Sequence, residues 1–232
     1  GCGTGAYTAA LTSYVSRIEA IDLNPSMLAL ARERLASNQS NTRVNFQLGS
    51  VMATPFEHEA VNAVMINQVL HHFGDNADTG WVKVGQVLSE FSRILKPGGK
   101  LQIMVYNYES VWLHLYTAYD HQINKGLYNE LSLLDAFRKT TDGPHCPISH
   151  CYKPSIFLQK VKDIGFEGEF KGSAISLLEL SILPLRFKAI QDRRLAKEHR
   201  EFLSSLQFNH YGHPIYNGFV AGILACYKFI KS

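Results

Sequence analysis

Apolar and polar residues in the first half of the chain follow two different periods. Short runs that are mostly apolar or that alternate, at 17–22, 44–48, 61–66 and 101–106, predict β-strands. The apolar run at 61–66 is typical of a strand covered on both faces. Apolar residues in 81–95 instead recur at helical spacing. Strands that alternate with helices predict an α/β fold, with a mostly parallel sheet and helices on both faces.

Residues that start or stop helices sharpen these boundaries. Residues 6–15 carry small and apolar side chains without proline, which predicts a helix after the opening glycines. Asn24 is a natural N-cap and Pro25 suits the first helical position, so a second helix is predicted to run to about Ser37. The Lys-Pro-Gly-Gly sequence at 96–99 ends the later helix and turns the chain.

Composition places the chain among ordinary globular proteins. Its 232 residues suit one domain, and 46% hydrophobic with 19% charged residues are typical of such a domain. A net charge of +3 is too small to indicate nucleic-acid binding. Cys2, Cys146, Cys151 and Cys226 form no disulfide framework, so we expect free thiols in the cytoplasm. No apolar run is long enough to span a membrane, and the oligomeric state stays open.

Glycines open the chain in a pattern suited to ligand binding. Gly1, Gly3 and Gly5 precede a helix, so backbone N–H groups can approach a ligand closely. Asp22 ends the first strand, where its carboxylate can accept hydrogen bonds from both hydroxyls of a ribose. The alternatives are a tight turn without ligand and an Asp that only caps a helix. Asn24 competes for that capping role, which favours the ligand.

Five segments together resemble class I S-adenosylmethionine (SAM)-dependent methyltransferases of the small-molecule type 11 group. They are residues 1–5, 20–28, 48–56, 67–73 and 95–101, in the order and at the spacing of that family. The resemblance covers about the first 105 residues. It implies a Rossmann-like, doubly wound sheet and SAM as the cofactor.

The resemblance assigns roles to individual positions. It implies that the glycines pass the amino-acid part of SAM and that Asp22 holds the ribose. It also implies that Leu23 and Met27 pack on the adenine and that the backbone N–H of Val51 faces a ring nitrogen. Asn67 and Gln68 are implied to lie under the methionine part. The implied cofactor-binding residues are Gly1, Gly3, Gly5, Asp22, Leu23, Met27, Ser50, Val51, Asn67 and Gln68.

Two departures from the family pattern affect the cofactor half. The family usually has an acid at position 50, and Ser50 accepts a hydrogen bond without charge, so weaker cofactor binding is expected. The family's first strand, with an acid near the methionine, would lie just before Gly1. We therefore expect the first strand to be missing, and the chain to be a fragment of a longer protein that folds or binds SAM poorly alone.

The second half has weaker patterns. After a cofactor-binding half at 1–107, residues 108–150 are expected to form a lid or substrate region. Residues 151–232 are expected to hold the last strands, with a long antiparallel apolar strand at 219–229. A charged amphipathic helix is predicted at 184–206. We favour a solvated face for this helix, with a membrane surface or an acidic substrate as the alternatives.

Methyl transfer from a sulfonium depends mostly on positioning the acceptor, so a catalytic triad is not required. His71 and His72 follow the strand at 61–66 and are candidate general bases, with packing as the favoured alternative. Aromatic residues in the lid region could cover an acceptor or simply pack against the core. The candidate substrate residues are Tyr106, Tyr108, Trp112 and His145.

Two His-Cys pairs raise the question of a metal. His145-Cys146 and His150-Cys151 could together form a tetrahedral zinc site. Their spacing matches no usual zinc pattern, so we expect no metal here.

Taken with the resemblance, the motifs favour a methyltransferase that acts on a small-molecule acceptor. A catalytically weak SAM-binding regulatory subunit is one alternative, because of Ser50 and the missing strand. An NAD(P)-dependent Rossmann oxidoreductase is another, because Gly1, Gly3 and Ala6 also fit the dinucleotide pattern. The tight glycine spacing and the segments 67–73 and 96–99 argue against the oxidoreductase.

Overall fold

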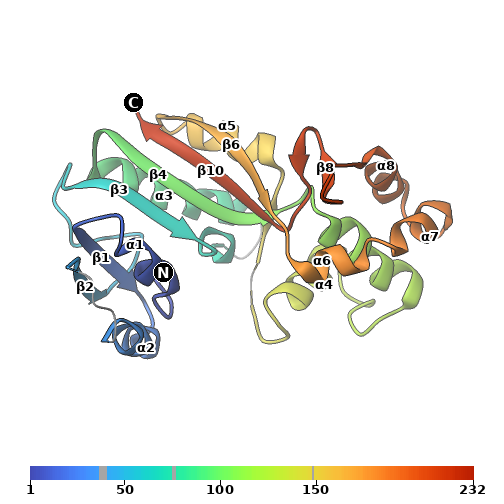
Figure 1. Cartoon of the computed structure of the whole chain (residues 1–232), viewed down its shortest axis with the longest axis horizontal. Coiled ribbons are helices and arrows are strands. Elements are labelled where there is room, and N and C mark those ends of the chain that lie inside the picture. The colour runs from blue at the N-terminus through green and yellow to red at the C-terminus, as the bar shows by residue number, and fades with distance from the viewer. Residues whose placement is uncertain (37–40, 75–76, 148) are drawn as a thin grey trace.

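A computed structural model describes residues 1–36, 41–74, 77–147 and 149–232 (Figure 1). Its strands are β1 (Arg17–Asp22), β2 (Arg43–Leu48), β3 (Val61–Asn67), β4 (Leu95–Asn107), β5 (Cys151–Tyr152), β6 (Phe166–Ala174), β7 (Gln207–Phe208), β8 (Pro214–Tyr216), β9 (Phe219–Val220) and β10 (Leu224–Lys231). Its helices are α1 (Ala6–Leu11), α2 (Pro25–Ala36), the 3₁₀ helix η1 (Leu70–His72), α3 (Ala77–Ile94), the π-helices η2 (Trp112–Thr117) and η3 (Asp120–Asn124), α4 (Leu133–Thr141), α5 (Pro154–Lys162), α6 (Leu177–Ile182), α7 (Leu185–Gln191) and α8 (Lys197–Ser205). Within these ranges, each helix is too short or too polar to cross a bilayer.

The strands of the described residues form three sheets, of which β7-β8-β9 is a small antiparallel one. β1 and β2 pair in parallel, and a second sheet has the order β3-β4-β10-β6, with β5 added beside β4. The β3–β4 pairing is parallel, whereas β10 runs antiparallel to both β4 and β6. This confirms the mostly parallel sheet with an antiparallel C-terminal strand. In the described part of the chain, no strand pairs β1 with β3.

Local signals set the first elements. β1 and the start of α2 lie where the pattern predicts them, and the predicted end of α2 at Ser37 falls outside the described residues. The Asn24 side chain caps α2 by accepting a hydrogen bond from the backbone of Ser26 at 2.9 Å. α1 ends at Leu11 rather than near residue 15. There the Thr12 hydroxyl bonds to a backbone oxygen in the last turn, which competes with the helix.

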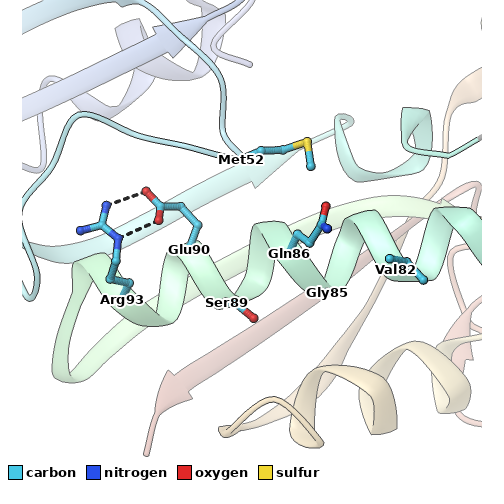
Figure 2. A pocket seen from close by; sticks show the side chains of 7 residues that line it. All are labelled: Met52, Val82, Gly85, Gln86, Ser89, Glu90 and Arg93. Atoms are coloured by element: carbon cyan, nitrogen blue, oxygen red, sulfur yellow. Dashed lines mark hydrogen bonds and ion pairs between the residues drawn. The ribbon is translucent and has the colours of Figure 1, made fainter.

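α3 has a solvent-facing side that borders the chain around Met52. Between them lies an open groove of about 550 Å³ (Figure 2). It is lined by Met52, Val82, Gly85, Gln86, Ser89, Glu90 and Arg93. None of these residues is among the predicted cofactor contacts, so the groove is distinct from the predicted SAM site.

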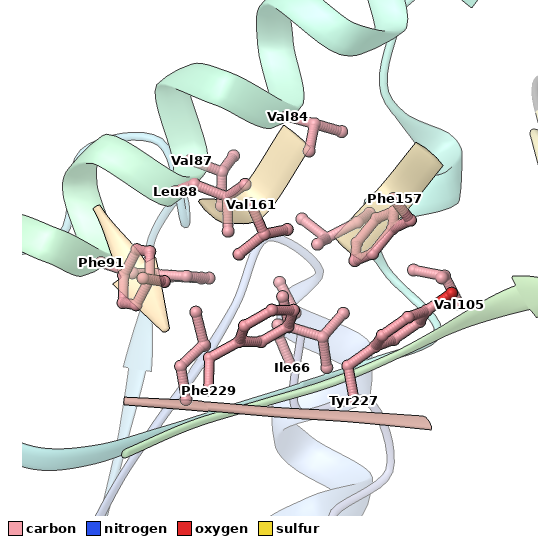
Figure 3. Packing of buried hydrophobic residues seen from close by; sticks show 14 of the residues in the cluster. Ile66, Val84, Val87, Leu88, Phe91, Val105, Phe157, Val161, Tyr227 and Phe229 are labelled. Carbon is pink, nitrogen blue, oxygen red and sulfur yellow. The ribbon is translucent and has the colours of Figure 1, made fainter. Parts of the chain in front are cut away.

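The inner side of α3 packs on the second sheet together with α5 (Figure 3). This first core cluster includes Ile66, Val84, Val87, Leu88, Phe91, Val105, Phe157, Val161, Tyr227 and Phe229. The α3 members recur at helical spacing, as the sequence pattern predicts. On the opposite face of the sheet, Met65 is 39% exposed and Ile230 46% exposed, so that face is partly open.

A second core cluster lies around η2 and the helices that follow β6. Its buried members include Leu113, Leu115, Phe137, Ala189, Leu195, Phe202 and Leu203. The predicted single helix at 184–206 is wrong, because α7 and α8 are separate. Between them Asp192 has extended backbone, and its carboxylate accepts hydrogen bonds from the backbone and guanidinium of Arg194, at 3.0 and 2.7 Å. That local turn competes with helical hydrogen bonds and ends α7.

The apolar run at 219–229 also contains a break. β9 pairs with β8, whereas β10 joins β4 and β6. At Gly222 an added Cβ would lie 2.1 Å from the backbone oxygen of Ala174. This close approach of two backbones separates the two strands, and only a glycine permits it.

Candidate functional site

The glycine loop at residues 1–5 meets the carboxylate at the end of β1. Asp22 is 8% exposed, and its Oδ2 accepts a hydrogen bond from the backbone N–H of Gly3 at 2.7 Å. Its Oδ1 accepts a hydrogen bond from the backbone N–H of Asn24 at 2.9 Å. Each carboxylate oxygen can accept a further hydrogen bond. The two motifs that the sequence separates by a helix and a strand are therefore in direct contact.

The three glycines of the loop have different surroundings. Gly5 has a φ of 74°, and an added Cβ would lie 2.9 Å from the Cβ of Ala31, so it is needed for packing against α2. An added Cβ at Gly1 would lie 2.4 Å from a methyl group of Val69. Gly3 has a φ of 53°, and no described atom lies within 4 Å of its added Cβ. Gly3 is thus the loop position with open space beside it.

Two apolar residues follow Asp22 along the chain. Leu23 follows Asp22 and is 69% exposed, while Met27 on the first turn of α2 is half-buried. An apolar side chain this exposed gains free energy when a flat apolar ring covers it. Both lie on the segment at the carboxyl end of β1.

Ser50 and Val51 begin the loop that follows β2. The Ser50 hydroxyl oxygen accepts a hydrogen bond from the backbone N–H of Met52 at 3.1 Å. Val51 is partly buried against the first core cluster. The hydroxyl that replaces the family's acid therefore helps to form a turn, and it keeps one lone pair for another donor.

The same loop is anchored to α3 by a side chain that the sequence did not indicate. Glu90 accepts hydrogen bonds from the backbone N–H and hydroxyl of Thr54, at 2.8 and 2.5 Å. Arg93 donates two hydrogen bonds to Glu90, both at 2.7 Å (Figure 2). These bonds, the Arg93 guanidinium foremost, lower the pKa of Glu90 to about 2. The sequence showed only an acid and an arginine three residues apart on a helix.

Asn67 and Gln68 lie at the end of β3. Gln68 has a φ of 56°, and its backbone N–H donates to the Met104 oxygen at 2.8 Å. Asn67 Oδ1 is 3.5 Å from the side-chain nitrogen of Gln102, and the buried Nδ2 has no partner among the described residues. A buried amide without a partner favours a ligand that accepts its hydrogen bond.

His71 and His72 form the end of η1. His71 is 1% exposed, and its Nε2 lies 3.0 Å from Nε2 of His72. The His71 ring lies 4.3 Å from the ring of Tyr106, whose hydroxyl donates to Asp142 Oδ1 at 2.6 Å. Burial lowers the pKa of His71 well below its usual 6.5. These side chains come together at the carboxyl ends of β3 and β4.

The other candidate substrate residues are placed apart from that group. Tyr108 is half-buried, with its ring edge-on to that of His114. Trp112 is buried in the second core cluster and packs on Tyr116. His145 is exposed. Tyr106 is therefore the candidate that the structure brings to His71.

The two His-Cys pairs do not form one cluster in the described residues. Donor atoms that come within 4.8 Å of one another belong to His71, His72 and Asp142 instead. Cys146 lies beside this group, with its sulfur 3.8 Å from Nδ1 of His72.

Comparison with known proteins identifies the cofactor half. Residues 1–103 match the family described as Methyltransferase domain. Over these residues the chain is similar to the class I methyltransferases. The cofactor of this family is SAM.

Two curated relatives match the same part of the chain. Over 103 residues the chain is 33% identical to "Demethylmenaquinone methyltransferase" of Shouchella clausii. This match covers 43% of this chain and 40% of that protein. Over 105 residues the chain is 32% identical to "Uncharacterized methyltransferase-like C25B8.10" of Schizosaccharomyces pombe. This match covers 45% of this chain and 35% of that protein. The match thus spans well under half the length of these relatives.

A solved structure extends the likeness in fold to the whole chain. A SAM-dependent methyltransferase structure from Methanosarcina mazei aligns with a TM-score of 0.59 at 15% identity. The alignment covers 100% of this chain and 89% of the other. At this identity it shows the fold alone.

Proposed function

We propose that this protein transfers the methyl group of SAM to a small-molecule acceptor. The observation that carries the proposal is the contact between Gly3 and Asp22. It brings an open glycine backbone and a buried carboxylate together at the carboxyl end of β1. In open parallel sheets, ligands bind at this edge.

The residues around this contact fit the parts of an adenosyl ligand. The free lone pairs of Asp22 suit the two ribose hydroxyls. Leu23 and Met27 offer apolar surface for the adenine, and Ser50 can accept from its amino group. The unpartnered amide of Asn67 suits the carboxylate of the methionine part. When bound, SAM supplies an electrophilic methyl group on a positively charged sulfur.

The protein's own contribution is to position the acceptor and to exclude water. Tyr106 and His71 offer buried aromatic surface at the carboxyl ends of β3 and β4. A small acceptor is supported by the demethylmenaquinone methyltransferase among the relatives. Its methyl-accepting atom would approach along this edge of the sheet.

Calorimetry with SAM, S-adenosylhomocysteine and NADH tests the cofactor. We expect SAM and S-adenosylhomocysteine to bind and NADH not to bind. The variant Asp22→Asn removes the charge while keeping the shape, and SAM affinity should fall by about 10- to 100-fold. The exposed Asp163 at the end of α5 gives a matched control, because Asp163→Asn should bind SAM like the wild type.

Each outcome discriminates between the candidate functions. Binding of NADH without SAM would support an oxidoreductase and overturn the proposal. Binding of SAM without transfer of a labelled methyl group to any small-molecule fraction would favour a regulatory subunit. An unchanged SAM affinity in Asp22→Asn would contradict the proposed site.

A further inference from the structure

Two histidines and one aspartate converge at the carboxyl ends of β3 and β4. His71 and His72 come from η1, and Asp142 directly follows α4. A donor atom of each lies within 4.8 Å of the other two. We propose that this His–His–Asp cluster binds a divalent transition-metal cation of the zinc class. The proposal goes beyond methyl transfer, and it does not depend on SAM binding.

The spacing of the imidazole nitrogens suits a shared ion. Nε2 of His71 and Nε2 of His72 are 3.0 Å apart. Nitrogen ligands bind zinc at about 2.0–2.1 Å, so two ligands of one ion lie roughly 2.9–3.4 Å apart in octahedral or tetrahedral geometry. The two rings therefore already have the separation that coordination requires.

Two buried polar atoms in the cluster lack partners. Asp142 Oδ1 is held by the Tyr106 hydroxyl, whereas Oδ2 is buried and has no hydrogen-bond partner among the described residues. The same holds for Nδ1 of His71. Burying a carboxylate oxygen without a partner is costly, and a cation would remove that cost. The Tyr106 hydroxyl acts as an orienting group of the kind that commonly surrounds metal ligands.

The donor set determines the class of cation. Two imidazoles and one carboxylate suit zinc, iron(II), cobalt(II) and related ions, whereas magnesium and calcium prefer oxygen ligands only. Two neutral imidazoles with one carboxylate carry a single negative charge. The neighbouring cation on α4, Arg138, is paired with Asp135 at 3.0 Å. Three protein ligands leave a position open, as in catalytic rather than structural zinc sites.

Metal titrations of the purified, tag-free chain test the proposal without SAM. After treatment with a chelator, we expect Zn²⁺ to bind at one equivalent in calorimetry. Co²⁺ should give the visible absorption bands of a coordinated ion. Mg²⁺ should give no heat. Absence of stoichiometric Zn²⁺ binding by the folded wild type would overturn the proposal.

Variants locate the bound ion. Asp142→Asn and His72→Gln should each lower Zn²⁺ affinity more than tenfold, and Tyr106→Phe should lower it by about tenfold through loss of orientation. His58→Gln changes an exposed histidine and should bind like the wild type. Cys146→Ser should also retain binding. If Cys146→Ser abolishes binding while Asp142→Asn preserves it, the ion is on the thiol and the His–His–Asp cluster is refuted.

Discussion

Acidification to pH 5 is expected to weaken the second core cluster through a pair of buried histidines. His114 in η2 and His199 in α8 face each other, with their Nδ1 atoms 2.9 Å apart. The His114 ring also stacks on Phe202, with ring centroids 4.1 Å apart. Burial, together with the neighbouring His199, lowers the pKa of His114 to about 3. Burial also lowers the pKa of His199.

The size of the effect follows from the pKa difference between the folded and unfolded chains. Unfolded histidine has a pKa of about 6.5, so below that pH the unfolded chain binds a proton that folded His114 rejects. Because the folded pKa of His114 is the lower one, the folded chain keeps its full free energy of unfolding above pH 6.5. It loses part of that free energy progressively as the pH falls towards 3. Between pH 8 and pH 5, His114 alone should reduce the free energy of unfolding by about 2 kcal/mol.

Urea unfolding of the wild type and of His114→Phe at pH 8 and pH 5 measures this contribution. Phenylalanine keeps the stacking on Phe202 and cannot be protonated. Apart from the coupled His199, the ionisable groups have the same surroundings in both proteins, so the wild type should lose about 2 kcal/mol more than the variant on acidification. His58→Phe, at a side chain that is 68% exposed, should retain the pH dependence of the wild type. Equal losses in the wild type and His114→Phe would refute the reasoning.

Two further predictions concern the loops around the candidate site. Gly5→Ala should destabilise the fold by about 2 kcal/mol or more, because it combines a φ of 74° with a contact at 2.9 Å. Gly98→Ala is the matched control, because the φ of Gly98 is 71° but no described atom lies within 4 Å of the added Cβ. Equal shifts in thermal unfolding for Gly5→Ala and Gly98→Ala would show that the packing of Gly5 on α2 is irrelevant. Glu90→Gln should weaken the hydrogen bonds from Thr54 and Arg93, because a neutral amide accepts less strongly than a carboxylate, and should lower SAM affinity several-fold in calorimetry, although Glu90 lies outside the predicted contacts. Glu201→Gln, in an exposed ion pair, should leave that affinity unchanged, and an unaltered affinity in Glu90→Gln would contradict the anchoring role.

Sequence reasoning succeeded where structure depends on neighbours along the chain. Asn24 and Pro25 mark the start of α2 because capping and proline geometry act within one turn. The sequence predicted that the opening glycines and Asp22 serve one ligand, and the direct hydrogen bond between Gly3 and Asp22 is a finding of the structure.

The sequence could not reveal features that depend on distant or competing contacts. The break at Asp192 arises because its carboxylate competes with the helix, which a helical apolar pattern does not register. Glu90 meets Thr54 only after α3 packs beside the loop that follows β2. Asp142 reaches His71 only through the folding of residues 108–142, and no local spacing pattern encodes that approach.

The hydrogen bond between Asp22 and Gly3 has a consequence for how a nucleoside would arrive. The loop is already fixed by the carboxylate, so little conformational entropy remains to be lost on association. If a nucleoside binds at the carboxyl end of β1, its encounter should require no slow rearrangement of this loop, and capture should then be limited by diffusion and orientation. The aspartate thus preorganises the very backbone beside which it would hold the sugar.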